Sequence, residues 1–149
     1  MLPQETVTEA VRLTFEEMAF LDVAPGLATA MMEDVEDGPV LFLSYSLPQS
    51  GSFALFLPKE IKFQVAEAIY GESWRLLSSI QLDDSLLELM NVLVGRLLTV
   101  RFGNASTYAM GLPTVLYGSP EDPPGQKRTD YLFHVDDDSF CLAWWEVAP

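Results

Sequence analysis

The sequence predicts an α/β domain of the α+β type, built from two related halves. The predicted elements run helix, strands, helix and then again helix and strands, whereas an open parallel sheet needs strands and helices that alternate. The chain has 149 residues, of which 49% are hydrophobic, and this is the usual size of a domain with a single core. We therefore expect one domain spanning residues 1–149.

The first half is expected to begin with an amphipathic helix over Thr6–Leu21. Apolar residues recur there at helical spacing between polar ones: Val7, Ala10, Val11, Phe15, Met18 and Ala19. Pro25 and Gly26 then predict the end of the helix.

Three apolar stretches follow and predict two firm strands after a weaker first one. Turn signals at residues 37–39 and 48–51 separate these stretches, which are LATAMM (27–32), VLFLSYSL (40–47) and FALFL (53–57). Pro58 favours the start of a second helix over 59–70, because the N–H group that proline lacks is not needed in a first turn. Gly71 predicts its end.

The second half is expected to open with a long helix. The loosely patterned residues 72–82 lead to Asp83 or Asp84, either of which can cap a helix that runs to about Phe102 and ends at Gly103 or Asn104. Three strands are expected after it, joined by a Pro/Gly-rich loop over 119–129 and an acidic turn at 136–138: GLPTVLY (111–117), YLFHV (131–135) and FCLAWWEV (140–147).

The two long helices share a short stretch of similarity. Residues 15–21 placed over residues 87–93 match Glu with Glu and Met with Met, while Ala19 stands where the second helix has Asn91. Amphipathic helices also resemble one another by chance. An internal duplication and a chance match both remain open on this comparison.

Charge and cysteine content exclude several functions. The formal net charge is −14, and such a field repels nucleic acid and anionic lipid surfaces. Cys141 is the only cysteine, so neither an internal disulfide nor a cysteine metal cluster is expected. The first ten residues lack a signal-peptide pattern, and no apolar run reaches the roughly 20 residues of a membrane helix. We expect a cytoplasmic protein that binds neither nucleic acid nor membrane.

The long helix carries the candidate site. Residues 86–98 are apolar around almost the whole helix, whereas Asp84, Glu88, Asn91 and Gly95 fall within an arc of roughly 60° at 100° per residue. A glycine inside a helix costs up to about 1 kcal/mol, so a neighbouring helix or a partner is expected close to Gly95. The alternative interpretation is a solvent-facing edge whose polar residues serve solubility alone.

This pattern resembles the signature of the CheC/CheX chemotaxis phosphatases. The resemblance rests on Glu88-x-x-Asn91-x-x-x-Gly95, preceded by Asp84 and followed by Leu-Pro-Thr-Val at 112–115. It implies two pseudo-symmetric halves with long helices on antiparallel sheet, and hydrolysis of the aspartyl phosphate of a CheY-like response regulator. The first helix reads Glu-Glu-Met-Ala at 16–19 and lacks the carboxamide, which is similar to the CheX branch with one site per chain.

The resemblance also implies the role of each site residue. Asn91 would orient the attacking water, because a neutral carboxamide both donates and accepts hydrogen bonds and brings no negative charge to an anionic transition state. Glu88 would support catalysis and pair with the regulator's active-site lysine, within a partner-binding surface of Asp84, Glu88 and Gly95. Mg²⁺ is expected on the regulator, and no cofactor or metal on this chain. The alternative function is a non-catalytic interaction module like those of the flagellar switch.

Three further features lie outside this site. His134 is expected to be a packed or surface residue, and the aspartates at 136–138 to form a solvated hairpin turn rather than a calcium loop. The apolar terminal strand 140–147 is expected to lie at a sheet edge, where it would pair with a second subunit. The resemblance to CheX also favours a homodimer.

Overall fold

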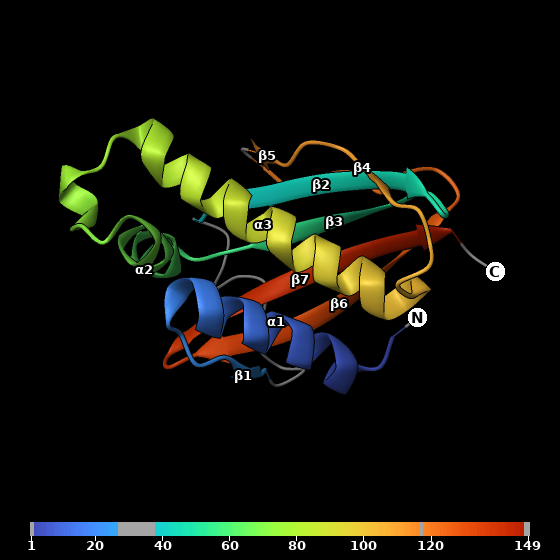
Figure 1. The fold of residues 1–149 in the computed structure, drawn as a ribbon, viewed down its shortest axis with the longest axis horizontal. Coiled ribbons are helices and arrows are strands. Elements are labelled where there is room, and N and C mark those ends of the chain that lie inside the picture. The colour runs from blue at the N-terminus through green and yellow to red at the C-terminus, as the bar shows by residue number, and fades with distance from the viewer. Residues whose placement is uncertain (1, 27–37, 117, 148–149) are drawn as a thin grey trace.

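The computed structural model describes residues 2–26, 38–116 and 118–147. Its helices are α1 (Gln4–Ala19), α2 (Lys59–Tyr70) and α3 (Ser79–Phe102), with a short 3-10 helix, η2 (Trp74–Leu76), between α2 and α3. Its strands are β1 (Ala24–Pro25), β2 (Val40–Leu47), β3 (Gly51–Phe56), β4 (Ala109–Met110), β5 (Thr114–Leu116), β6 (Gln126–Val135) and β7 (Asp138–Val147). Figure 1 shows α1 and α3 lying across one face of the sheet, with α2 at one end.

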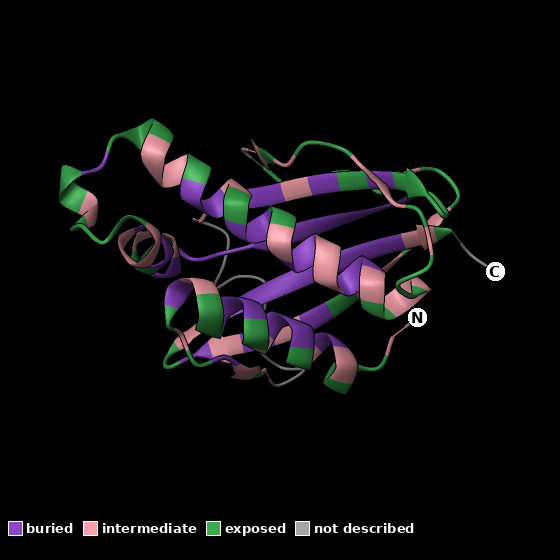
Figure 2. Ribbon diagram, viewed as in Figure 1, coloured by how far each residue is buried: buried purple, intermediate pink, exposed green. Residues whose placement is uncertain are grey.

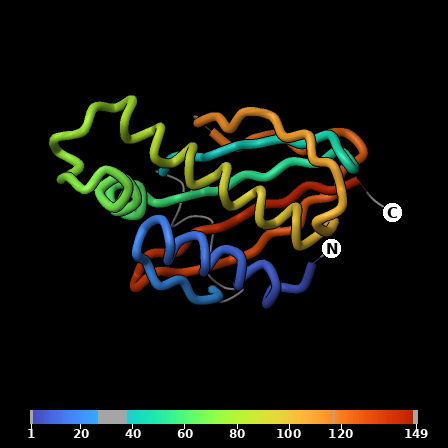
Figure 3. Tube along the Cα trace, in the orientation of Figure 1, coloured from blue at the N-terminus to red at the C-terminus, as the bar shows by residue number. Residues whose placement is uncertain are grey.

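The described strands form one antiparallel sheet of seven strands in the order β1-β6-β7-β3-β2-β4, with β5 also paired to β2. Matching α1 with α3, β1 with β5, β2 with β6 and β3 with β7 reverses the order of the sheet around its centre, where Ala54 of β3 lies opposite Ala143 of β7. The first strand of each half pairs with the second strand of the other half. The expected α+β fold with two pseudo-symmetric halves is therefore confirmed, and the halves share one sheet (Figure 3).

Large apolar side chains fill the space between the helices and the sheet. Phe15 of α1 packs on Phe140 of β7, with ring centroids 5.0 Å apart. Phe102 of α3 meets Tyr45 of β2 at 6.3 Å. The Tyr45 hydroxyl is buried, and it accepts a hydrogen bond of 3.0 Å from the indole of Trp144. The core thus joins residues of both halves, and Figure 2 shows buried residues in purple along the helices and the sheet.

The opposite face of the sheet is also covered near its centre. The Trp145 indole donates a hydrogen bond of 2.7 Å to Asp122 in the loop before β6. The Arg128 guanidinium lies over the rings of Phe56 and Trp145, at 5.5 Å and 5.2 Å. Phe56 and Trp145 are consequently buried.

The predicted elements of the first half are largely confirmed. The strand at 40–47 and the helix at 59–70 have the predicted bounds, and Gly71 ends α2 in a left-handed conformation. The first helix runs from Gln4 to Ala19, so it begins and ends two residues earlier than predicted. Phe20 caps its C-terminus with φ of 55°, and Pro25 lies in β1. The weak strand predicted at 27–32 lies outside the described residues.

The second half departs from prediction in three places. Within the strand predicted at 111–117, the described structure forms a strand over Thr114–Leu116, and no sequence pattern predicts β4. β6 begins at Gln126, inside the predicted loop, because Gln126 to Asp130 pair with β7. The acidic turn is shorter than predicted, since Asp138 already belongs to β7.

The prediction that the terminal strand forms a sheet edge is wrong. β7 pairs with β3 on one side and with β6 on the other, so it lies in the middle of the sheet. Its many apolar residues reflect burial on both faces rather than an interface. None of the described helices combines the length and hydropathy of a transmembrane segment.

Candidate functional site

The candidate site lies on α3, whose first turn is fixed by a capping box. The Ser78 hydroxyl accepts a hydrogen bond of 3.1 Å from the Gln81 N–H, and the Gln81 side chain accepts one of 2.9 Å from the Ser78 N–H. The prediction that Asp83 or Asp84 caps this helix is therefore wrong. The capping box Ser-Ser-Ile-Gln at 78–81 starts the helix several residues before Asp83, and Asp84 lies inside the helix.

One face of α3 is buried against the rest of the domain, so the opposite face of the helix points toward solvent. The buried residues are Ser85, Leu86, Leu89, Met90, Leu93, Val94, Leu97 and Leu98. Asp84, Glu88 and Asn91 are exposed, and Gly95 is half-buried. The structure thus brings all four predicted site residues onto one outward stripe, with Glu88 and Asn91 one turn apart.

The side chains of Glu88 and Asn91 have no partner among the residues that the structure describes. No hydrogen bond or ion pair connects either side chain with another residue that the structure describes. Asp83, by contrast, lies 3.8 Å from the ammonium group of Lys62. A carboxylate and a carboxamide without partners among the described residues therefore face outward together from α3.

Gly95 borders open space. A Cβ atom built on Gly95 would meet no heavy atom within 4 Å, so the expected close approach of a neighbouring helix is absent among the described residues. Gly95 and Asn91 instead line a groove of about 520 Å³ between α1 and α3. Of the two explanations for this glycine, an approaching partner is the one that remains.

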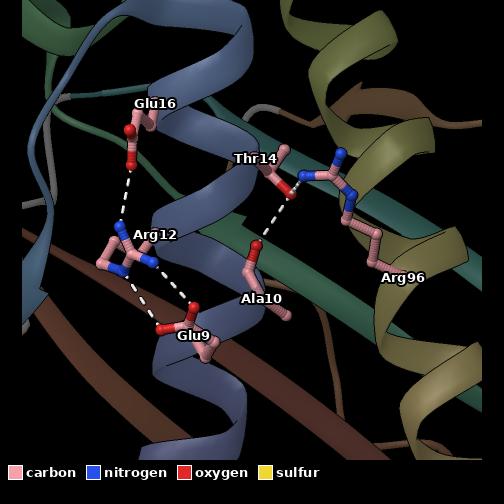
Figure 4. Close-up of polar contacts among 6 residues, drawn as sticks. All are labelled: Glu9, Ala10, Arg12, Thr14, Glu16 and Arg96. Atoms are coloured by element: carbon pink, nitrogen blue, oxygen red, sulfur yellow. Dashed lines mark hydrogen bonds and ion pairs between the residues drawn. The ribbon is translucent and has the colours of Figure 1, made fainter.

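Arg96 connects the two long helices beside this groove. Its guanidinium donates a hydrogen bond of 3.1 Å to the buried hydroxyl of Thr14, which itself donates to the Ala10 carbonyl at 2.8 Å (Figure 4). It also forms an ion pair with Glu17. Arg101, near the C-terminal end of the same helix, pairs with Glu146 at 3.0 Å. Both positive charges are thus balanced within the chain.

The corresponding face of α1 carries no such site. Aligning the buried residues of the two helices shows that the overlay of 15–21 on 87–93 is out of helical phase, because Ala19 is buried and Asn91 is exposed. When the buried positions of the two helices are aligned, either Arg12 or Glu16 occupies the position equivalent to Asn91. Neither Arg12 nor Glu16 is a carboxamide, so α1 lacks the counterpart of Asn91. The residue that shows this is Arg12 or Glu16, rather than Ala19.

The described residues offer little for metal or thiol chemistry. They contain no group of three or more His, Cys, Asp or Glu side chains arranged to hold a metal ion. His134 lies in β6 and is half-buried. Cys141 is fully buried in β7, and desolvation raises the pKa of its thiol to about 12.

The sequence pattern does not predict the apolar residues that line the groove beside the stripe. Leu13 lines the groove opposite Asn91 and Gly95, and it is 36% exposed. Val100, near the C-terminal end of α3, is 47% exposed on the same groove. A signal was present, because Leu13 is an apolar residue off the buried stripe of its helix. Its meaning depends on the packing of α1 against α3.

Fold and site together define a class of protein: an α+β domain of two halves that displays one carboxylate and one carboxamide on its second long helix. No family model matches the sequence, and no curated protein matches it significantly. Solved structures do match. The chemotaxis protein CheX of Desulfovibrio desulfuricans superimposes with a TM-score of 0.75 at 17% identity, over 95% of this chain and 97% of that one.

Two further CheX structures agree. CheX of Vibrio vulnificus gives a TM-score of 0.74 at 12% identity, over 97% of this chain and 99% of that one. CheX of Borrelia burgdorferi, solved in a complex with CheY, BeF3 and Mg²⁺, gives 0.69 at 15% identity, with 97% of each chain covered. The chain therefore has the CheC/CheX fold over nearly its full length.

Proposed function

We propose that this chain is a CheX-like phosphatase that hydrolyses the aspartyl phosphate of a CheY-like response regulator. The observation that carries the proposal is the pair Glu88 and Asn91, which faces outward from the long helix α3 without a partner among the described residues, in a chain with the CheX fold. The CheX–CheY complex of the Borrelia burgdorferi relative supports a CheY-like partner.

Asn91 is assigned the catalytic role. Phosphoryl transfer needs little covalent help, and a water held in line with the scissile bond is the main requirement. The Asn91 carboxamide can accept a hydrogen bond from that water and donate one to the phosphoryl group. A carboxylate at this position would bring negative charge toward an anionic transition state.

Glu88 is assigned a docking role with a supporting part in catalysis. A carboxylate one turn before Asn91 suits an ion pair with a lysine in the regulator's active site, and this pair would set the register of α3. Asp84 and Gly95 extend the contact surface along the same stripe. The net charge of −14 means that attraction is local to this surface rather than global.

The remaining assignments follow from the same resemblance. Mg²⁺ belongs to the regulator, and the phosphatase brings no cofactor of its own. The protein acts in the cytoplasm, where chemotaxis and other two-component pathways operate. It forms a homodimer, as CheX proteins do, although not through the central strand β7.

The test is the decay of aspartyl phosphate on the CheY-like receiver proteins of the source organism, phosphorylated by acetyl phosphate with Mg²⁺ present. Wild type is expected to accelerate decay, and Asn91→Ala to lose the acceleration by roughly 10²–10³-fold. Glu88→Ala is expected to weaken the acceleration mainly by raising the half-saturating concentration of the receiver.

The same assay distinguishes the alternative function. An interaction module would bind the phosphorylated receiver and leave its decay rate unchanged. Binding without acceleration, found with every receiver, would replace the phosphatase with that module.

A further inference from the structure

The groove between α1 and α3 is open, apolar and continuous with the candidate catalytic residue. Leu13 of α1 faces it from one side and Val100 of α3 from the other, with 36% and 47% of their surfaces exposed. Asn91 lines the same groove, which has a volume of about 520 Å³. A group that enters the groove would therefore lie beside the carboxamide.

The polar groups around the groove are already paired within the chain. Glu9 accepts hydrogen bonds of 2.7 Å and 3.1 Å from Arg12, and Arg96 is held by Thr14 and Glu17. The Thr99 hydroxyl donates to the Gly95 carbonyl at 2.9 Å. Asn91 is left as the polar side chain without a partner among the described lining residues. Such a lining favours an apolar occupant.

Gly95 keeps the floor of the groove empty. Glycine inside a helix is less stable than alanine by about 0.8–1.0 kcal/mol, and the open space around a Cβ here shows that packing among the described residues does not require it. Any larger side chain at this position would project into the groove. The glycine thus maintains space for something outside the chain.

We propose that this groove receives an apolar side chain of the CheY-like regulator, from the surface beside its phosphorylated aspartate. The inference rests on the proposed function and adds a second contact to it. Glu88 holds the regulator by charge, and the groove holds it by apolar burial on the other side of Asn91. Two contacts that flank the carboxamide fix its position relative to the phosphoryl group better than the ion pair alone.

The first experiment fills the groove in steps with Gly95→Ala and Gly95→Leu. Both variants should resist urea better than wild type, because they remove a glycine from the helix and meet no atoms. The half-saturating concentration for dephosphorylation should rise about threefold for Gly95→Ala and tenfold or more for Gly95→Leu. This change should exceed the change in maximal rate.

The second experiment compares two equally exposed valines. Val100→Gln changes the groove wall. Val147 is also 47% exposed, but it lies on the same sheet face as Trp145, two residues earlier, and this face points away from α1 and α3. Val100→Gln should raise the half-saturating concentration several-fold, and Val147→Gln should leave it unchanged.

The outcomes separate this inference from the proposed function. If wild type accelerates decay and Gly95→Leu does so with the same half-saturating concentration, the function stands and the groove inference is wrong. If wild type accelerates no receiver's decay, the function is wrong, and binding of the receiver with BeF3 and Mg²⁺ then decides the groove by comparing wild type with Gly95→Leu. A loss of dimer on light scattering with unchanged regulator kinetics would assign the groove to a second copy and overturn the inference.

Discussion

α1 and α3 occupy equivalent places in the two halves, yet their outward faces differ. On α1, Arg12 donates hydrogen bonds of 2.7 Å to Glu9 and 2.8 Å to Glu16, and these charges satisfy one another (Figure 4). The bond from Arg12 lowers the pKa of the Glu9 carboxyl. On α3, Glu88 and Asn91 have no such partners within the described part of the chain. The comparison indicates that a polar face satisfied within its own helix is surface, whereas one left unsatisfied is available to a partner.

The two helices also differ in how their starts are fixed. Pro3 precedes α1 without any side-chain cap, whereas α3 begins with the reciprocal bonds of Ser78 and Gln81. α3 has 24 residues and α1 has 16. The helix that displays the candidate site is thus the longer and the better anchored one.

Reversing one charge on each helix should give the largest contrast. Glu88→Lys places a cation against the lysine expected on the regulator, and the half-saturating concentration should rise more than tenfold in the dephosphorylation assay. Glu16→Lys is the matched change on α1, where it removes a pair with Arg12, and regulator kinetics should stay within twofold.

Equal effects of Glu88→Lys and Glu16→Lys would contradict this distinction between the faces. They would show that overall charge, rather than the position of Glu88, governs docking. Raising the salt concentration offers a check, because an ion pair at the interface weakens as screening increases.

The contact between α1 and α3 should matter more for stability than the ion pairs within α1. Arg96→Met keeps the aliphatic stem but removes the bonds to Thr14 and Glu17, and it should lower the free energy of unfolding by about 1–2 kcal/mol. Arg12→Met breaks only exposed pairs and should cost less. Urea unfolding of both variants measures the difference, and a larger loss for Arg12→Met would contradict this account.

The sequence was sufficient to place the four candidate residues on one stripe, because helical spacing alone defines it. Glu88 and Asn91 lie one turn apart on any α-helix, and the apolar residues around them determine which side faces out. The groove was not predictable in this way. It depends on where Leu13 of α1 lies relative to Gly95, and only tertiary packing brings those helices together.

The errors in the predicted fold have a similar origin. The apolar run at 140–147 suggested an exposed edge, whereas in the structure it is the middle strand, because β3 and β6 approach it from different halves. β4 has only two residues and is held by β2 alone, so no periodic pattern marks it. Long-range pairing was decisive in both cases.

Removing the cap of α3 should produce a smaller effect that tests how firmly the site helix is held. Ser78→Ala deletes the acceptor of the Gln81 N–H, and the free energy of unfolding should fall by about 1 kcal/mol. Ser79→Ala, one residue later, breaks no hydrogen bond seen in the described structure and serves as the control. If Ser78→Ala also slowed dephosphorylation beyond its effect on stability, the first turn of α3 would itself belong to the docking surface.

The smallest effect concerns Asp138 at the turn between β6 and β7. Desolvation, together with the negative charges of Glu60, Asp137 and Asp136, raises the pKa of its carboxyl above 3.8. A carboxyl with a raised pKa binds its proton more tightly in the folded state, so the folded state loses stability as pH rises above the unfolded value. Asp138→Asn should therefore raise the urea midpoint slightly at pH 7, by less than Ser78→Ala lowers it, and this gain should vanish near pH 3. A gain of equal size at both pH values would show that the negative charge of the Asp138 carboxylate is not its cause.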